Sequence, residues 1–153
     1  MFSKKYIIIA GLLGLLALGR VLTRPTAPTE PTLIFPTQNW LLQIEIADAE
    51  AERNRGLSGR ASLPADSGLF FIFEAVSQPG FWMKDMNFPI DIIWIDEDWR
   101  IVGITANATP NSYPQIFYPP APIKYALEIN AGLSAKHHLQ IGDPIEFAVF
   151  TSK

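Results

Sequence analysis

The chain has 153 residues, of which 48% are hydrophobic and 18% charged, a composition that fits one globular domain with a short appendage. It has no cysteine and two histidines, which excludes disulfide scaffolds and thiol nucleophiles and leaves little for a metal centre, so we expect neither a metal nor a cofactor. Residues 1–30 contain four basic residues and one acidic residue, which leaves 8 basic and 14 acidic residues, a net charge of −6, for residues 31–153. Because nucleic-acid affinity depends on Lys and Arg displacing counterions from phosphates, an acidic body argues against a nucleic-acid partner.

Residues 1–22 predict an export signal or a membrane anchor. Two lysines precede an apolar run from Tyr6 to Gly19, which Arg20 closes, and secretion signals have this order of charged and apolar residues. As a helix the run would be about 21 Å long, whereas a bilayer core is about 30 Å thick. A cleaved signal and an uncleaved anchor both stay open. In either case we expect an exported protein, periplasmic or extracytoplasmic, tethered to the inner membrane if the segment is uncleaved.

Residues 23–37 predict a Pro/Thr-rich linker. Pro25, Pro28, Pro31 and Pro36 remove backbone donors and favour extended polyproline geometry. At about 3.1 Å per residue, such a spacer could hold a domain up to roughly 45 Å from a membrane. If the signal is cleaved, the same stretch is a tail.

Residues 38–153 predict a single β domain. Trp40 to Ala47 alternates apolar and polar side chains, which is typical of a half-buried strand, and residues 48–55 favour a short helix that Asp48 begins and Gly56 ends. The further expected strands cover residues 68–73, 81–84, 90–95, 99–106, 123–129 and 145–150. We therefore expect an all-β fold with one or two short helices, either a small barrel or a jelly-roll-like sandwich.

The segment 109–122 contains five prolines and three aromatic residues, a pattern too interrupted for a regular strand. It predicts an edge cover or a lid. One interpretation is a surface loop whose aromatic side chains close the core beneath it, and the other is a loop that gates a ligand.

Asp91 is the most informative charged residue because it lies in an apolar strand, residues 90–95. An ion in a low-dielectric interior must be paired or lose its charge, so a cation or another donor is expected to meet it. The candidates are Arg60 and Lys84, which lie near predicted strand or loop ends. Glu128 differs, because alternation along its strand places it on the more polar face.

These residues suggest a polar pocket for a small ligand, with Trp82 as a stacking wall. Its expected members are Arg60, Trp82, Lys84, Asp91 and Glu128. The alternative is a structural ion-pair network that fixes loops. A second hypothesis makes Asp91 and Glu128 the acid–base pair of a hydrolase, which requires two carboxylates in different environments a few ångströms apart. A third is a structural protein-interaction module, which would have a wide exposed apolar patch and no pocket.

The order and spacing of five motifs resemble the bacterial and archaeal family known as domain of unknown function 192. The motifs are ERNRGLSGR (52–60), GLFFIF (68–73), FWMKDM (81–86), PIDIIWID (89–96) and YALEINAG (125–132). The resemblance covers residues 41–150 and implies a compact, mostly β domain, often exported behind a signal or anchor. It implies no established activity. The charged residues of the predicted pocket fall on positions that match the family pattern.

Overall fold

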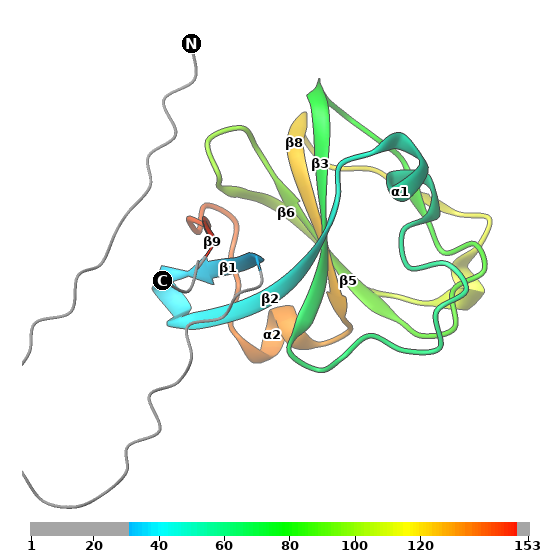
Figure 1. Cartoon of the computed structure of the whole chain (residues 1–153). Coiled ribbons are helices and arrows are strands. Elements are labelled where there is room, and N and C mark those ends of the chain that lie inside the picture. The colour runs from blue at the N-terminus through cyan, green and yellow to red at the C-terminus, as the bar shows by residue number, and fades with distance from the viewer. Residues whose placement is uncertain (1–30, 150–153) are drawn as a thin grey trace, which may run out of the picture.

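Nine strands and two short α-helices make up residues 31–149, the part of the chain that the computed structural model describes (Figure 1). The expected segment 1–22 lies outside this range. In chain order the elements are β1 (Pro31–Phe35), η1 (Pro36–Gln38), β2 (Trp40–Ala47), α1 (Glu50–Arg55), β3 (Ser67–Ser77), β4 (Phe81–Trp82), β5 (Ile90–Ile95), β6 (Ile101–Ala108), η2 (Pro110–Ser112), β7 (Ile116–Phe117), β8 (Ile123–Asn130), α2 (Leu133–Lys136) and β9 (Glu146–Val149). None of the helices in residues 31–149 is long and apolar enough to cross a bilayer.

Seven strands form one sheet in the order β6-β5-β8-β3-β2-β1-β9, and β4 and β7 form a separate pair. Neighbouring strands are antiparallel except for β2 and β3, which are parallel. The expected mostly β fold with two short helices is confirmed. The sheet does not close into a barrel, because its edge strands β6 and β9 form no ladder with each other in the described chain. The segments that precede these two strands meet in an isolated bridge between Arg100 and Pro144 and in a few backbone hydrogen bonds around it.

The sheet buries side chains on both faces. The first core, on one face, includes Leu42, Phe70, Ile93 and Leu127. The second core, on the other face, is built around the side chains of Phe71, Ile92, Trp94 and Ala126, with Leu57, Met83 and Met86 packed onto them from the loops. Side chains of successive strand residues point to opposite faces, so every residue of β5 is buried on one face or the other.

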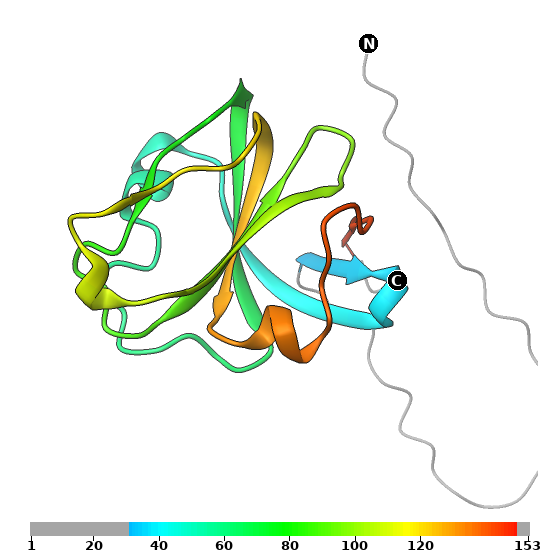
Figure 2. The ribbon, with the colours of Figure 1, turned by 180° about the vertical axis from the view of Figure 1, so that it is seen from behind.

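Figures 1 and 2 show how the other elements cover these two faces. The segment with α1 and the loops that carry β4 and β7 lie on one side of the β3–β8 pair. The strands β1 and β9 and the helix α2 lie on the other side. Leu33 and Phe35 of β1 belong to the first core, and Phe81 and Phe117 of β4 and β7 pack against the second.

The structure differs from the sequence expectation at the end of the linker. Residues 31–37, assigned there, form β1 and most of η1, and β1 pairs with both β2 and β9. The physical reason is burial, since Leu33 and Phe35 are fully enclosed in the first core. Burial of these apolar side chains therefore stabilises a strand here despite the prolines.

The short elements that connect the main strands also differ in detail from the sequence expectation. Ala49, not Asp48, is the N-cap of α1, and the Glu52 carboxylate accepts the Asp48 and Ala49 N–H groups at 3.3 and 3.2 Å. Gly56 ends the helix with a φ of 51°. Within the segment 109–122, β7 pairs with β4, so part of this proline-rich loop supplies a strand after all.

Candidate ligand pocket

A pocket of about 150 Å³ opens between the end of α1 and the second-core face of the sheet. Four aromatic side chains line it: Phe71, Phe73, Phe81 and Trp82. The C-terminal turn of α1 contributes Arg53 and Arg55, and Glu128 contributes the carboxyl group from β8. Three segments far apart in the sequence therefore build one concavity with apolar walls and a few polar groups, as small-molecule sites usually have.

Glu128 is the polar group at the base of this pocket. Its side chain is only 6% exposed, and its Oε2 atom has no hydrogen-bond partner in residues 31–149. The neighbouring residues across the sheet are Leu69 on β3 and Ile92 on β5, both apolar. Burial raises the pKa of Glu128 to about 8, and the positive charge of Arg60 offsets only part of this effect. At neutral pH this raised pKa favours the protonated form of Glu128, which can both donate and accept a hydrogen bond.

Gly56 allows the end of α1 to lie over Glu128. A Cβ atom at this position would lie 3.5 Å from the Phe71 ring and 3.7 Å from Oε2 of Glu128. Its positive φ of 51° is one that residues with side chains rarely adopt. The glycine thus ends the helix and leaves the space beside the buried acid open.

Arg60 lies beside the pocket and is engaged in an ion pair with Glu45. Its guanidinium donates two hydrogen bonds to the Glu45 carboxylate, at 2.6 and 2.8 Å. Glu45, Leu69 and Glu128 are register neighbours on β2, β3 and β8, so the two carboxyl groups flank Leu69 on one face. The hydrogen bonds from Arg60 lower the pKa of Glu45, whereas burial raises that of Glu128. Two acids on one face therefore have opposite protonation tendencies.

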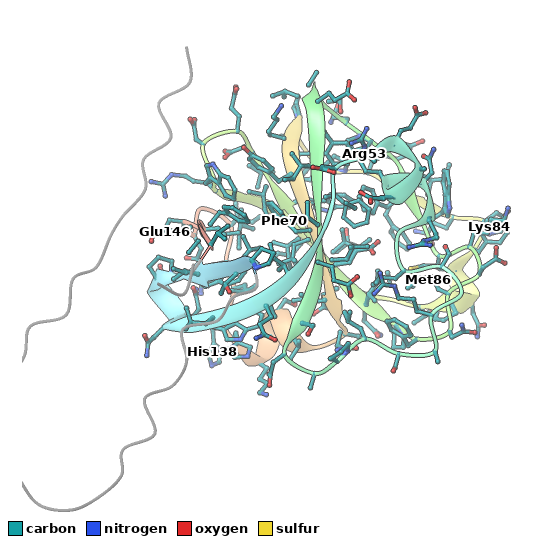
Figure 3. The ribbon with its side chains drawn as sticks, viewed as in Figure 1. Arg53, Phe70, Lys84, Met86, His138 and Glu146 are labelled. Atoms are coloured by element: carbon teal, nitrogen blue, oxygen red, sulfur yellow. The ribbon has the colours of Figure 1, made fainter. Side chains whose placement is uncertain are left out.

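Trp82 lines the pocket, and Lys84, two residues further along the chain, does not. Trp82 is 46% exposed and forms part of the wall. Lys84 is exposed at the edge of the molecule, and in the described range its ammonium forms no ion pair (Figure 3). Its backbone carbonyl instead accepts a hydrogen bond from the Ser58 hydroxyl at 2.8 Å, and Gly59 N–H donates to the Asp85 carbonyl at 2.8 Å. These bonds hold the 56–60 loop against the 83–87 turn.

Asp91 lies apart from the pocket. It is fully buried, and its carboxylate accepts hydrogen bonds from three backbone N–H groups, those of Asn107 at 2.8 Å and of Gly132 and Ser134 at 3.0 Å, and from the Ser134 hydroxyl at 2.6 Å. The expected donors are thus present, but they are mostly backbone groups, and neither Arg60 nor Lys84 bonds to this residue. Asp91 holds the start of α2 and the end of β6 against the sheet.

The predicted site residues therefore separate into three groups. Trp82 and Glu128 line one pocket, with Arg60 close enough to act electrostatically on Glu128. Lys84 belongs to the adjoining turn. Asp91 is opposite Ile129, a first-core residue, whereas Glu128 is opposite Ile92, a second-core residue, so the two acids lie on opposite faces of the sheet. They cannot act on the same atom of a substrate.

The comparison with protein families decides the family. The model of DUF192, described as "Uncharacterized ACR", matches residues 34–147. The chain belongs to the DUF192 family. The resemblance that the five sequence motifs indicated is confirmed.

Two solved structures resemble this DUF192 chain at a TM-score of 0.71 each. One is a protein of unknown function from Novosphingobium aromaticivorans, 32% identical, with 76% of this chain and 83% of that chain covered. The other is named "a putative transcription regulator" from Sinorhizobium meliloti, 31% identical, with 78% of this chain and 93% of that chain covered. Among curated proteins there is no match.

Most of the pocket walls of this DUF192 domain were not predicted from the sequence. Phe71 and Phe73 have the same strand parity as Leu69, which places them on the face that carries Glu128. Arg55 and Gly56 lie at the end of the expected helix. This helix boundary was the one local signal that they could lie near a strand face. The pairing of β3 with β8, which brings these residues together, has no local signal in the sequence.

Proposed function

We propose that this DUF192 domain is a small-ligand-binding module and that the pocket over Glu128 holds the ligand. One observation carries the proposal: a buried carboxyl oxygen with no partner faces a pocket with aromatic walls. Leaving a buried polar atom unpaired costs about 1–3 kcal/mol, so its presence needs a reason. A ligand that supplies the missing hydrogen bond is such a reason, and perturbed acids in clefts are frequent functional groups.

Asp91 supports this proposal by contrast. It is equally buried in the sheet, but four donors satisfy its carboxylate, as a structural acid requires. The structural ion-pair alternative fits Arg60 and Glu45, which bond to each other. It does not fit Glu128, which bonds to no side chain in the described part of the chain.

Other function classes have less support. A protein-interaction module would have a wide apolar patch and no pocket, whereas this domain has a pocket. The regulator name belongs to the Sinorhizobium protein, and here a net charge of −6 over residues 31–153 argues against DNA as a partner. A hydrolase that uses Asp91 and Glu128 as a pair is disfavoured by their opposite faces.

The location of the module is part of the proposal. The lysine-flanked apolar run in residues 1–22 and the prolines that follow it favour an exported domain in the periplasm or another extracytoplasmic compartment. If the run remains uncleaved, it would tether the module to the inner membrane. The ligand would then be a molecule of the cell envelope.

Native mass spectrometry of the full chain, purified from its own envelope, tests the proposal. The wild type is compared with Glu128→Met, which removes the acid while keeping its length, and with Glu97→Met, a matched change at the exposed tip of the β5–β6 hairpin. Wild type and Glu97→Met should retain the same small molecule, and Glu128→Met should lose it without a lower melting temperature. No adduct in any sample, or an equal adduct in Glu128→Met, would contradict the proposal.

A further inference from the structure

We infer that the ligand is a small organic anion with one flat ring or an equivalent planar group, such as an aromatic carboxylate. This inference depends on the proposed function, because it assigns a chemical class to the ligand of the same pocket. It rests on the size of the pocket, on its aromatic walls and on the charged residues that line it.

The size and walls favour one planar group. The volume of about 150 Å³ is that of a cavity that holds a benzene-sized molecule. The partly buried Phe73 and Phe81 rings lie edge to face, with centroids 6.4 Å apart at 69°, so the two neighbouring walls offer aromatic surfaces in different orientations. A flat ring can pack against one such surface and meet the edge of the other, which are the favoured geometries for aromatic pairs.

The charged side chains that line the pocket are mostly basic. They are Arg53, Arg55 and Glu128, and Glu74 pairs with Arg53 at 3.7 Å. Because its raised pKa favours the protonated form of Glu128, the lining itself is locally positive at neutral pH although the domain is acidic. Such a region raises the local concentration of anions and lowers that of cations.

Arg55 is the basic residue best placed to contact an anion. Arg53 already donates to the backbone carbonyls of Asp48 and Ile72, and Arg60 is bonded to Glu45. Arg55 lines the pocket and is exposed, and in residues 31–149 its guanidinium forms no hydrogen bond or ion pair. A guanidinium presents paired donors that match a carboxylate, so Arg55 is the expected anchor for the negative group.

Glu128 complements an anion at the base of the pocket. The group packed over it from α1 is Gly56, β3 and β5 present Leu69 and Ile92, and the charged group that acts on it is Arg60. While it is protonated, Glu128 can donate to an oxygen atom of the ligand. Once ionised, it would repel a carboxylate, so anion binding should weaken as the pH rises past the pKa of about 8.

Three probes of nearly equal shape separate the charge classes: benzoate, benzamide and benzamidinium. Each is titrated into the folded full chain at neutral pH, and the backbone amide shifts of Gly56, Phe71 and Phe81 report binding in the pocket. The variants are Arg55→Gln and, as the matched control, Arg100→Gln, whose arginine donates to the Gly142 carbonyl and does not line the pocket. Benzoate should bind about tenfold more tightly than benzamidinium. Arg55→Gln should weaken benzoate about fivefold and benzamide less than about twofold, and Arg100→Gln should change neither.

Each of the other outcomes contradicts a different part of the inference. If benzamide or benzamidinium binds as tightly as benzoate, the anion class is wrong while the pocket remains a binding site. If benzoate binds but Arg55→Gln has no effect, the assigned anchor is wrong. If no probe shifts these amides, the ring-sized anion is excluded, and the mass-spectrometric comparison of Glu128→Met with the wild type decides separately whether the pocket binds anything.

Discussion

Asp91 and Glu128 lie on adjacent, hydrogen-bonded strands, yet their carboxyl groups point to opposite faces of the sheet. Asp91 accepts four hydrogen bonds, whereas Oε2 of Glu128 accepts none within residues 31–149. Two acids one register step apart thus differ: the carboxylate of one joins parts of the fold, and the other has the unpaired oxygen to which we assign the proposed ligand.

The stability of the protein should depend on pH through Glu128. Burial raises its pKa from 4.5 to about 8, so between these values the folded protein keeps a proton that the unfolded chain has lost. The free energy of unfolding should therefore fall as the pH rises from about 4.5 through about 8, by up to about 5 kcal/mol at about 1.4 kcal/mol per pKa unit. Urea unfolding of wild type and Glu128→Gln across this range measures it, because the variant lacks this titration. Parallel curves for the two proteins would contradict the assignment.

Asp91→Ala should destabilise the domain strongly and leave the pocket intact. The change leaves three backbone N–H groups without their buried acceptor, which should cost about 3–5 kcal/mol of unfolding free energy. Asp98→Ala, at the exposed tip of the β5–β6 hairpin, should cost less than about 0.5 kcal/mol. Urea unfolding at neutral pH compares the two variants. A loss below about 1 kcal/mol for Asp91→Ala would show that these bonds are not structural.

Arg60→Met should raise the pKa of Glu128 further. The positive charge of Arg60 lowers that pKa, so its removal leaves desolvation unopposed. Because the Arg60–Glu45 pair is partly exposed, at 28% and 55%, the loss in stability should stay below about 1 kcal/mol. Carboxyl ¹³C NMR titration of Glu128 measures the shift. Lys84→Met is the control and should leave the titration of Glu128 unchanged. If both variants shifted the pKa equally, the effect would come from the total charge of the protein and not from Arg60 in particular.

Gly56→Ala should impair both folding and binding. The new methyl group would lie 3.7 Å from Oε2 of Glu128 and 3.5 Å from Phe71, inside the pocket, and the positive φ adds strain of about 1 kcal/mol or more. Gly142→Ala is the matched control, because its φ of 93° is also positive but nothing lies within 4 Å of its added methyl. Both variants should lose stability, and only Gly56→Ala should lose benzoate binding. Undiminished binding in Gly56→Ala would place the ligand elsewhere.

Local patterns in the sequence predicted most of the strands. The alternation in Trp40–Ala47 and the apolar run Ile90–Ile95 give β2 and β5 with the expected bounds, because strand periodicity and burial agree there. The expectation was wrong for β1, where prolines suggested a linker but Leu33 and Phe35 enter the core. A closed barrel was one of the two expected folds, but the sheet is open. Closure depends on whether the two edge strands pair with each other, and these strands lie far apart in the sequence.

The candidate site was predictable only in part. The apolar context of Asp91 correctly indicated a buried acid, but the sequence does not show that Gly132 and Ser134 would supply its donors. Glu128 was placed on a polar face by parity, whereas pairing with β3 and β5 surrounds it with apolar neighbours. Burial and pocket formation depend on which strands meet, and no single segment encodes that.

The parallel pairing of β2 with β3 has a consequence for how this architecture could diversify. Parallel neighbours cannot be joined by a tight hairpin, so the chain must cross over the sheet between Ala47 and Ser67, and this crossover supplies α1, Gly56 and Arg60. The segment that covers the pocket from the α1 side is therefore one continuous stretch of chain, and its two ends lie in the paired strands β2 and β3. Changes in its length or composition could alter what is recognised while every strand pairing beneath it stays the same.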